Sequence, residues 1–134
     1  MLNPFPFLLT FSQIGPFIIR VTLGFLFAAA GARKLSQRCY DFEELFSSFD
    51  LPKPNIWIKF LGLIEFAGGI AMLAGFGTQI ASIVLAVITL LFFVIKYRRP
   101  EMLPPSPAYY VLIFAMSLSL LVTGAGAFAF DLPL

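Results

Sequence analysis

Four long apolar segments restrict the fold of this 134-residue chain more than any other feature of its sequence. They cover about residues 14–35, 56–76, 79–97 and 108–127. About 20 apolar residues are enough for one helix to span the hydrocarbon core of a bilayer. Hydrophobic residues make up 60% of the chain, compared with about 45–50% in ordinary soluble domains. The sequence therefore predicts an all-α protein with a single domain, a transmembrane four-helix bundle in a lipid bilayer.

Composition also excludes several classes of functional site. The chain has no histidine and one cysteine, so haem bound through histidine, a two-cysteine zinc site and a CxxC redox pair are all excluded. We expect no metal site, and a redox role would need an electron carrier from elsewhere. The net charge of +2 is too small to indicate binding to nucleic acid. Without a nucleophile–base pair or a cofactor-binding loop, catalysis by this chain alone is not expected.

The basic residues predict the orientation of the four helices. Every lysine and arginine except Arg20 lies in or beside the loops at 36–55 and 98–107. By the positive-inside rule these loops are predicted to be cytoplasmic, with both termini outside, in the inner (plasma) membrane of the cell. Residues 40–50 carry apolar side chains at helical spacing. This pattern predicts either an amphipathic helix on the membrane surface or a loop that covers the end of the bundle.

One arginine, Arg20, lies inside the first apolar segment. At about 100° per residue it shares one stripe of that helix with four further residues, Gly24, Phe27, Gly31 and Lys34. A charged side chain is costly in hydrocarbon, so this stripe is expected to face protein or a water-filled cavity. Its glycines would let a neighbouring helix approach closely. The third segment, by contrast, is nearly featureless and is expected to be structural and to face lipid.

Two carboxylates are candidate partners for Arg20. Glu65 lies about 13 Å from the cytoplasmic end of the second helix, and Arg20 lies about 21 Å from the cytoplasmic end of the first. Asp131 follows the fourth segment. A buried arginine favours such partners because its planar fork matches a carboxylate. Three interpretations stay open: an ion pair that only fixes helix packing, a polar pocket for a quinone headgroup, lipid or small anion, or a transporter in which Glu65 titrates.

Several motifs occur in a characteristic order, namely Arg20-x3-Gly24-x2-Phe27-x3-Gly31-x2-Lys34-Leu35, Gly62-Leu-Ile-Glu65-Phe-Ala-Gly68-Gly69 with Gly75, and Gly124-Ala-Gly126 with Asp131. This ordered set resembles the DoxX family of four-helix membrane proteins. The resemblance implies that Arg20, Glu65 and Asp131 occupy the characteristic polar positions of the family. The closing motif of the family usually reads Gly-Pro-Gly-Arg-aromatic-Ser-Leu-Asp. Here the proline, arginine and serine are replaced by Ala125, Ala127 and Ala129, which removes a cation from the outer face.

The family resemblance also implies a function. Members resemble the membrane subunit of thiosulfate:quinone oxidoreductase or associate with redox enzymes in oxidative-stress complexes. The chain is therefore expected to be an accessory membrane subunit of a redox system, with a redox enzyme as candidate partner. No cofactor is firmly predicted, and quinone is the candidate. An assembly factor or scaffold without ligand and a small proton-coupled transporter remain alternatives, and homo-oligomerisation is left open. No catalytic residue is predicted, and the expected site comprises the polar core Arg20, Lys34, Glu65 and Asp131 and the helix-packing glycines Gly24, Gly31, Gly62, Gly68, Gly69, Gly124 and Gly126.

Overall fold

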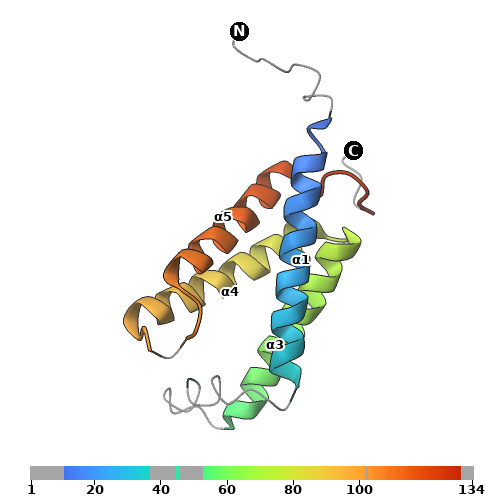
Figure 1. Cartoon of the computed structure of the whole chain (residues 1–134). Helices are drawn as coiled ribbons and strands as arrows, with labels where there is room; N and C mark the ends of the chain where they lie inside the picture. Colours follow the sequence, from blue (N-terminus) through green and yellow to red (C-terminus); the bar gives the residue numbers. More distant parts are fainter. Residues whose placement is uncertain (1–10, 37–44, 46–52, 102, 131–134) are drawn as a thin grey trace.

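The computed structural model describes residues 11–36, 45, 53–101 and 103–130 (Figure 1). Its helices are α1 (Ile14–Leu35), α3 (Pro54–Ala74), α4 (Thr78–Arg98) and α5 (Pro107–Thr123). No strand occurs among the described residues, so the predicted all-α fold is confirmed. The predicted amphipathic segment at 40–50 lies outside the described residues, except for Leu45, whose side chain is buried.

Proline and glycine determine where the helices begin and end. Both α3 and α5 start with a proline, whose missing backbone N–H removes no helical hydrogen bond in the first turn. Gly75 ends α3 because it takes the left-handed conformation (φ 71°), and α4 begins just beyond it. α5 ends at Thr123 rather than near residue 127 as predicted. The reason is that Gly124 and Gly126 both have positive φ angles, which a helix cannot contain.

Three helices are long and apolar enough to cross a membrane. α1 has 22 residues, α3 and α4 have 21 each, and large apolar side chains cover their outward faces. α5 is also apolar but has 17 residues, so it is shorter than the other three. Such helices belong to a multi-pass membrane protein whose surroundings are lipid, as the sequence predicts.

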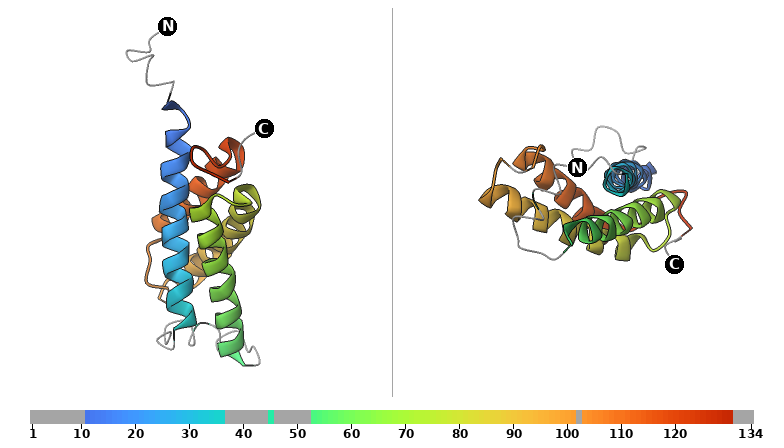
Figure 2. Two further views of the ribbon diagram at one scale, coloured as in Figure 1. Left: turned by 90° about the vertical axis from the view of Figure 1, so that its right-hand side faces the viewer. Right: turned by 90° about the horizontal axis from the view of Figure 1, so that it is seen from below.

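The helices form two antiparallel pairs. α1 packs along α3, and α4 packs along α5, with the second pair inclined to the first (Figures 1 and 2). We call the side on which α1 begins and α5 ends the terminal side, and the opposite side, on which α1 ends and α3 begins, the loop side. The core draws on all four helices through Leu23, Phe27, Met72, Leu85, Ile88, Phe92, Tyr110, Ile113 and Leu120. Because α4 supplies three of these side chains, the expectation that it mainly faces lipid is wrong for one of its faces.

Four glycines allow α1 and α3 to touch along their backbones. A Cβ atom on Gly31 would lie 2.6 Å from the carbonyl oxygen of Gly62, and one on Gly69 would lie 2.8 Å from that of Gly24. Real Cβ atoms do not come this close to another backbone, so only glycine fits at these positions. The contact brings the neighbouring side chains of α1 directly against α3, including the charged ones.

The other predicted packing glycines have different surroundings. A Cβ atom on Gly68 would lie 3.3 Å from Leu85 of α4. One on Gly126 would lie 2.6 Å from the backbone nitrogen of Phe17 in α1. No described atom lies within 4 Å of the Cβ position of Gly124. Glycine is therefore needed there for the positive φ of 77° rather than for close packing.

Candidate functional site

The charged residues expected to form one polar core occupy two separate places. Lys34 and Glu65 lie together toward the loop side. Arg20 lies toward the terminal side, against the residues that follow α5. Asp131 lies outside the described residues. Arg20, Lys34 and Glu65 therefore form two sites rather than one pocket.

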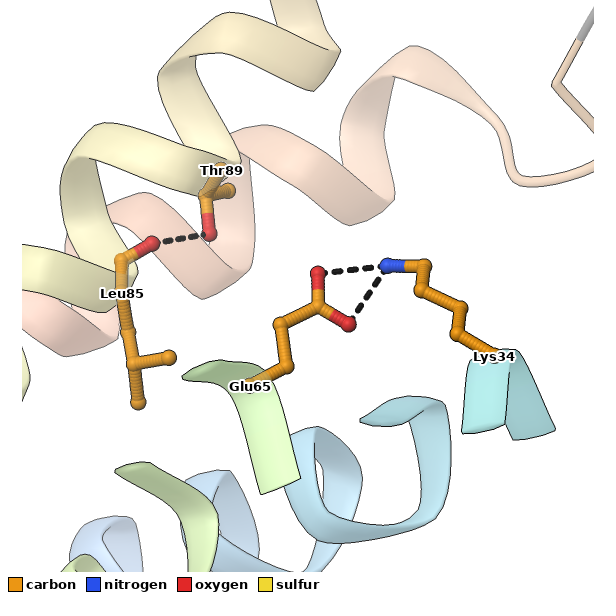
Figure 3. Close-up of polar contacts among 4 residues, drawn as sticks. All are labelled: Lys34, Glu65, Leu85 and Thr89. Carbon is orange, nitrogen blue, oxygen red and sulfur yellow. Dashed lines mark hydrogen bonds and ion pairs between the residues drawn. The ribbon is translucent and has the colours of Figure 1, made fainter. Parts of the chain in front are cut away.

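Lys34 and Glu65 form a buried ion pair between α1 and α3. The ammonium nitrogen Nζ of Lys34 donates to both carboxylate oxygens of Glu65, at 2.5 Å each (Figure 3). The two side chains are only 4% and 3% exposed. The ring of Phe92 in α4 completes the surroundings, with its centroid 4.6 Å from Nζ. Each charge thus neutralises the other in a place that water does not reach.

The glycine contact explains why these two side chains meet. Gly31 and Lys34 are three residues apart on α1, and Gly62 and Glu65 are three residues apart on α3, so each glycine shares a helix face with its charged residue. A Cβ atom on Gly62 would lie 2.8 Å from the Cβ of Lys34. Figure 3 also draws Thr89 of α4, whose hydroxyl donates to the carbonyl oxygen of Leu85 in its own helix at 2.7 Å. The carboxylate therefore depends on Lys34 rather than on Thr89.

Arg20 binds backbone carbonyls instead of a described carboxylate. Its Nη2 donates to the carbonyl oxygens of Ala127 at 3.3 Å and Phe128 at 3.2 Å, and the guanidinium carbon lies 5.5 Å from the centroid of the Phe17 ring. The residue is 1% exposed. A Cβ on Gly75 would overlap with Nη1, so this glycine makes room for the guanidinium. Among the described residues, Nε and Nη1 of Arg20 have no hydrogen-bond partner.

These contacts correct the expected pairing of Arg20 with Glu65. Arg20 lies level with Gly75, and Glu65 precedes Gly75 by ten residues in α3, about 15 Å along the helix axis. Sequence reasoning did not match Lys34 with Glu65, although the shared spacing of glycine and charge in both helices was a usable signal. The other expected pairing, with Asp131, lies outside the described residues and stays a prediction.

An apolar cavity lies between α3 and α4, and sequence reasoning did not anticipate it. It has a volume of about 340 Å³, and no polar atom of its walls faces it. Phe92 lines this α3–α4 cavity and also contacts Lys34, so the cavity and the ion pair share one aromatic ring. The lining residues are Leu45, Trp57, Phe60, Leu61, Ile64, Ile88, Leu91, Phe92 and Ile95.

The described residues contain no cluster of three or more histidine, cysteine, aspartate or glutamate side chains that could hold a metal ion. No curated protein and no solved structure matches the chain. A family model, that of DoxX, matches residues 15–98, which is more than half of the chain and includes Arg20, Lys34 and Glu65. Three long apolar helices, the glycine contact between α1 and α3 and the ion pair beside it all fall within the matched residues, and the chain therefore belongs to the DoxX family.

Proposed function

We propose that this DoxX protein is an accessory membrane subunit of a redox system and that its α3–α4 cavity holds the hydrocarbon chain of a quinone or lipid. The cavity is the observation that carries the proposal, because its apolar walls lie between two membrane helices. Ligand cavities occur preferentially between the helices of such bundles. The redox role itself rests on membership of the family.

The walls of the cavity fit a hydrocarbon chain but not a quinone ring. The carbonyl oxygens of such a ring need hydrogen-bond donors, and no polar atom of the lining faces the cavity. Glu65 and Lys34 satisfy each other beside Phe92, and Arg20 lies beside Gly75 at the end of α3. A quinone would therefore be held by its isoprenoid chain, and no redox step is assigned to residues of this chain.

Native mass spectrometry of the purified protein, with identification of the bound molecules, tests this proposal. Ile64 is half-buried and lines the cavity, so Ile64→Trp should fill it. Leu63 is its exposed neighbour on the same helix, and Leu63→Trp is the matched control. We expect bound quinone or lipid to fall about tenfold in Ile64→Trp, a change of about 1.4 kcal/mol in binding, and to stay unchanged in Leu63→Trp. Equal occupancy in both variants would contradict the proposal.

A scaffold without ligand is the second candidate function, and the buried Lys34–Glu65 ion pair favours it. Lys34 and Glu65 are buried and mutually satisfied, as expected of a contact that only holds two helices together. If wild-type protein carries no stoichiometric ligand, this candidate replaces the first. Proton-coupled transport through Glu65 receives no support from the geometry, because both of its oxygens accept hydrogen bonds from Lys34 and the residue is 2% exposed.

A further inference from the structure

The residues that follow α5 fold back against the first turns of α1. We call residues 124–130 the C-terminal turn. The backbone N–H of Ala127 donates to the carbonyl oxygen of Gln13 at 3.1 Å, and the ring of Phe128 meets that of Phe17 edge to face with centroids 5.6 Å apart. Figure 2 shows this part of the chain beside the beginning of α1. The C-terminal turn thus has a well-defined position along the helix.

That position lies within the depth of the membrane. The residues of α1 that contact the turn extend from Gln13 to Arg20, about 10 Å along the helix axis. The whole of α1 is about 33 Å long, which is close to the roughly 30 Å thickness of the hydrocarbon core. α5 is about 26 Å long and stops short of that thickness. A bilayer spanned by α1 would therefore have the C-terminal turn within its terminal-side leaflet, beyond the end of α5.

Backbone that is not helical needs partners from protein at this depth, because lipid offers none. The C-terminal turn obtains three such hydrogen bonds from Gln13 and Arg20 at the beginning of α1. Arg20 donates from Nη2 to the carbonyl oxygens of Ala127 and Phe128, and Gln13 accepts from the N–H of Ala127. A guanidinium provides several N–H donors in a fixed geometry, so a single side chain can replace the water that would hydrate these carbonyls at an aqueous surface.

The C-terminal turn also displays aromatic rings. Phe128 has a φ of 55°, a left-handed conformation that is unfavourable for a residue with a Cβ atom, and it is 86% exposed. Phe130 is 83% exposed. Phe76 in the neighbouring α3–α4 connection and Val122 at the end of α5 are exposed as well. Exposed apolar rings are unfavourable in water and favourable in contact with hydrocarbon. A strained backbone that holds these rings outward is therefore easier to explain in lipid than in water.

We propose that the C-terminal turn is a lipid-embedded segment in which Phe128 and Phe130 contact the acyl chains of the terminal-side leaflet. Arg20 is the positioning residue that donates to two of its carbonyl oxygens within the membrane. The occupant is lipid because the turn lies along α1 and beside the end of α3, two helices long enough to span the bilayer. The proposal concerns the end of α3 at Gly75, about 15 Å along the axis from Glu65, and does not depend on the function proposed above.

Fluorescence quenching tests the location of the turn. The chain has one tryptophan, so Trp57→Phe removes the background signal and Phe128→Trp introduces a reporter. Ile80→Trp, at an exposed position in the first turn of α4 on the same side of the membrane, is the matched lipid-facing control. The proteins are reconstituted into vesicles of phosphatidylcholine with or without brominated acyl chains. We expect both reporters to be quenched to a similar extent by brominated lipid and to be protected from aqueous acrylamide.

Two outcomes would overturn the proposal. Quenching of the Phe128→Trp reporter by acrylamide alone would place the C-terminal turn in water, and protection from both quenchers would mean that protein covers it. The role of Arg20 is tested by adding Arg20→Leu. We expect acrylamide quenching of the Phe128→Trp reporter to increase several-fold while the Ile80→Trp reporter is unaffected, which shows that the helices stay folded. An unchanged Phe128→Trp signal would exclude Arg20 as the positioning residue.

Discussion

Replacing both members of the Lys34–Glu65 pair by apolar side chains should cost less stability than replacing either one alone. Removal of one partner leaves a charge without water or counter-charge, since the side chains are 4% and 3% exposed. Such losses are about 3–5 kcal/mol in water-soluble proteins. In a membrane protein the unfolded state also finds polar partners, which reduces the loss. We therefore expect Lys34→Met to reduce the free energy of unfolding by about 3 kcal/mol, the lower end of that range.

The two single substitutions should reduce the free energy of unfolding by different amounts. Glu65→Met leaves Lys34 with the ring of Phe92, 4.6 Å from Nζ, and with a long stem in the last turn of α1 that can extend toward the loop side. Lys34→Met removes both hydrogen bonds to the carboxylate of Glu65 and leaves it, among the described residues, only the charge of the exposed Arg33. The expected loss for Glu65→Met is about 2 kcal/mol, so a double variant that loses less than either single variant requires a coupling free energy of about 3 kcal/mol or more.

Reversible unfolding in mixed micelles, with sodium dodecyl sulfate as the denaturant and helical circular dichroism as the signal, measures these differences. Thr89→Val is the matched control, because the Thr89 hydroxyl bonds to a carbonyl oxygen of its own helix and its loss should change stability by less than about 1 kcal/mol. If the two single losses add in the double variant, the charges are not coupled and the reasoning from their geometry fails. If the double variant also retains bound quinone or lipid, the pair serves packing alone.

Two further predictions concern stability, measured by the same unfolding assay. Gly31→Ala should destabilise the protein by about 1–3 kcal/mol because its Cβ would meet the backbone of α3. Gly15→Ala is the control: no described atom lies within 4 Å of its Cβ position, so it should be neutral or stabilising by up to about 1 kcal/mol. Equal effects would refute the close contact between the helices. Lys96→Met should reduce stability by about 1.5–3 kcal/mol because Nζ donates to the carbonyl oxygens of Pro100 and Leu103. Arg98→Met, at an exposed position in the same turn, should change stability by less than about 0.5 kcal/mol.

The helices themselves were predictable because their signals are local. Length and apolarity placed the four segments within a few residues of the observed helices. The spacing of Arg20, Gly24, Gly31 and Lys34 identified the face of α1 that is buried against protein. The end of α5 was misplaced because small apolar residues after Thr123 are compatible with a helix by composition. The positive φ angles of Gly124 and Gly126 ended it instead.

The sequence by itself determined the apolar helices, their approximate ends and the charged residues that must be buried, since each follows from periodicity and composition within one segment. Only the tertiary structure decided what those charges contact. Lys34 and Glu65 meet because glycines let two distant helices touch at one level, and Arg20 binds the C-terminal turn because that turn folds back along α1. The α3–α4 cavity is likewise a property of two packed surfaces. Such contacts depend on the relative position of helices, which no single segment encodes.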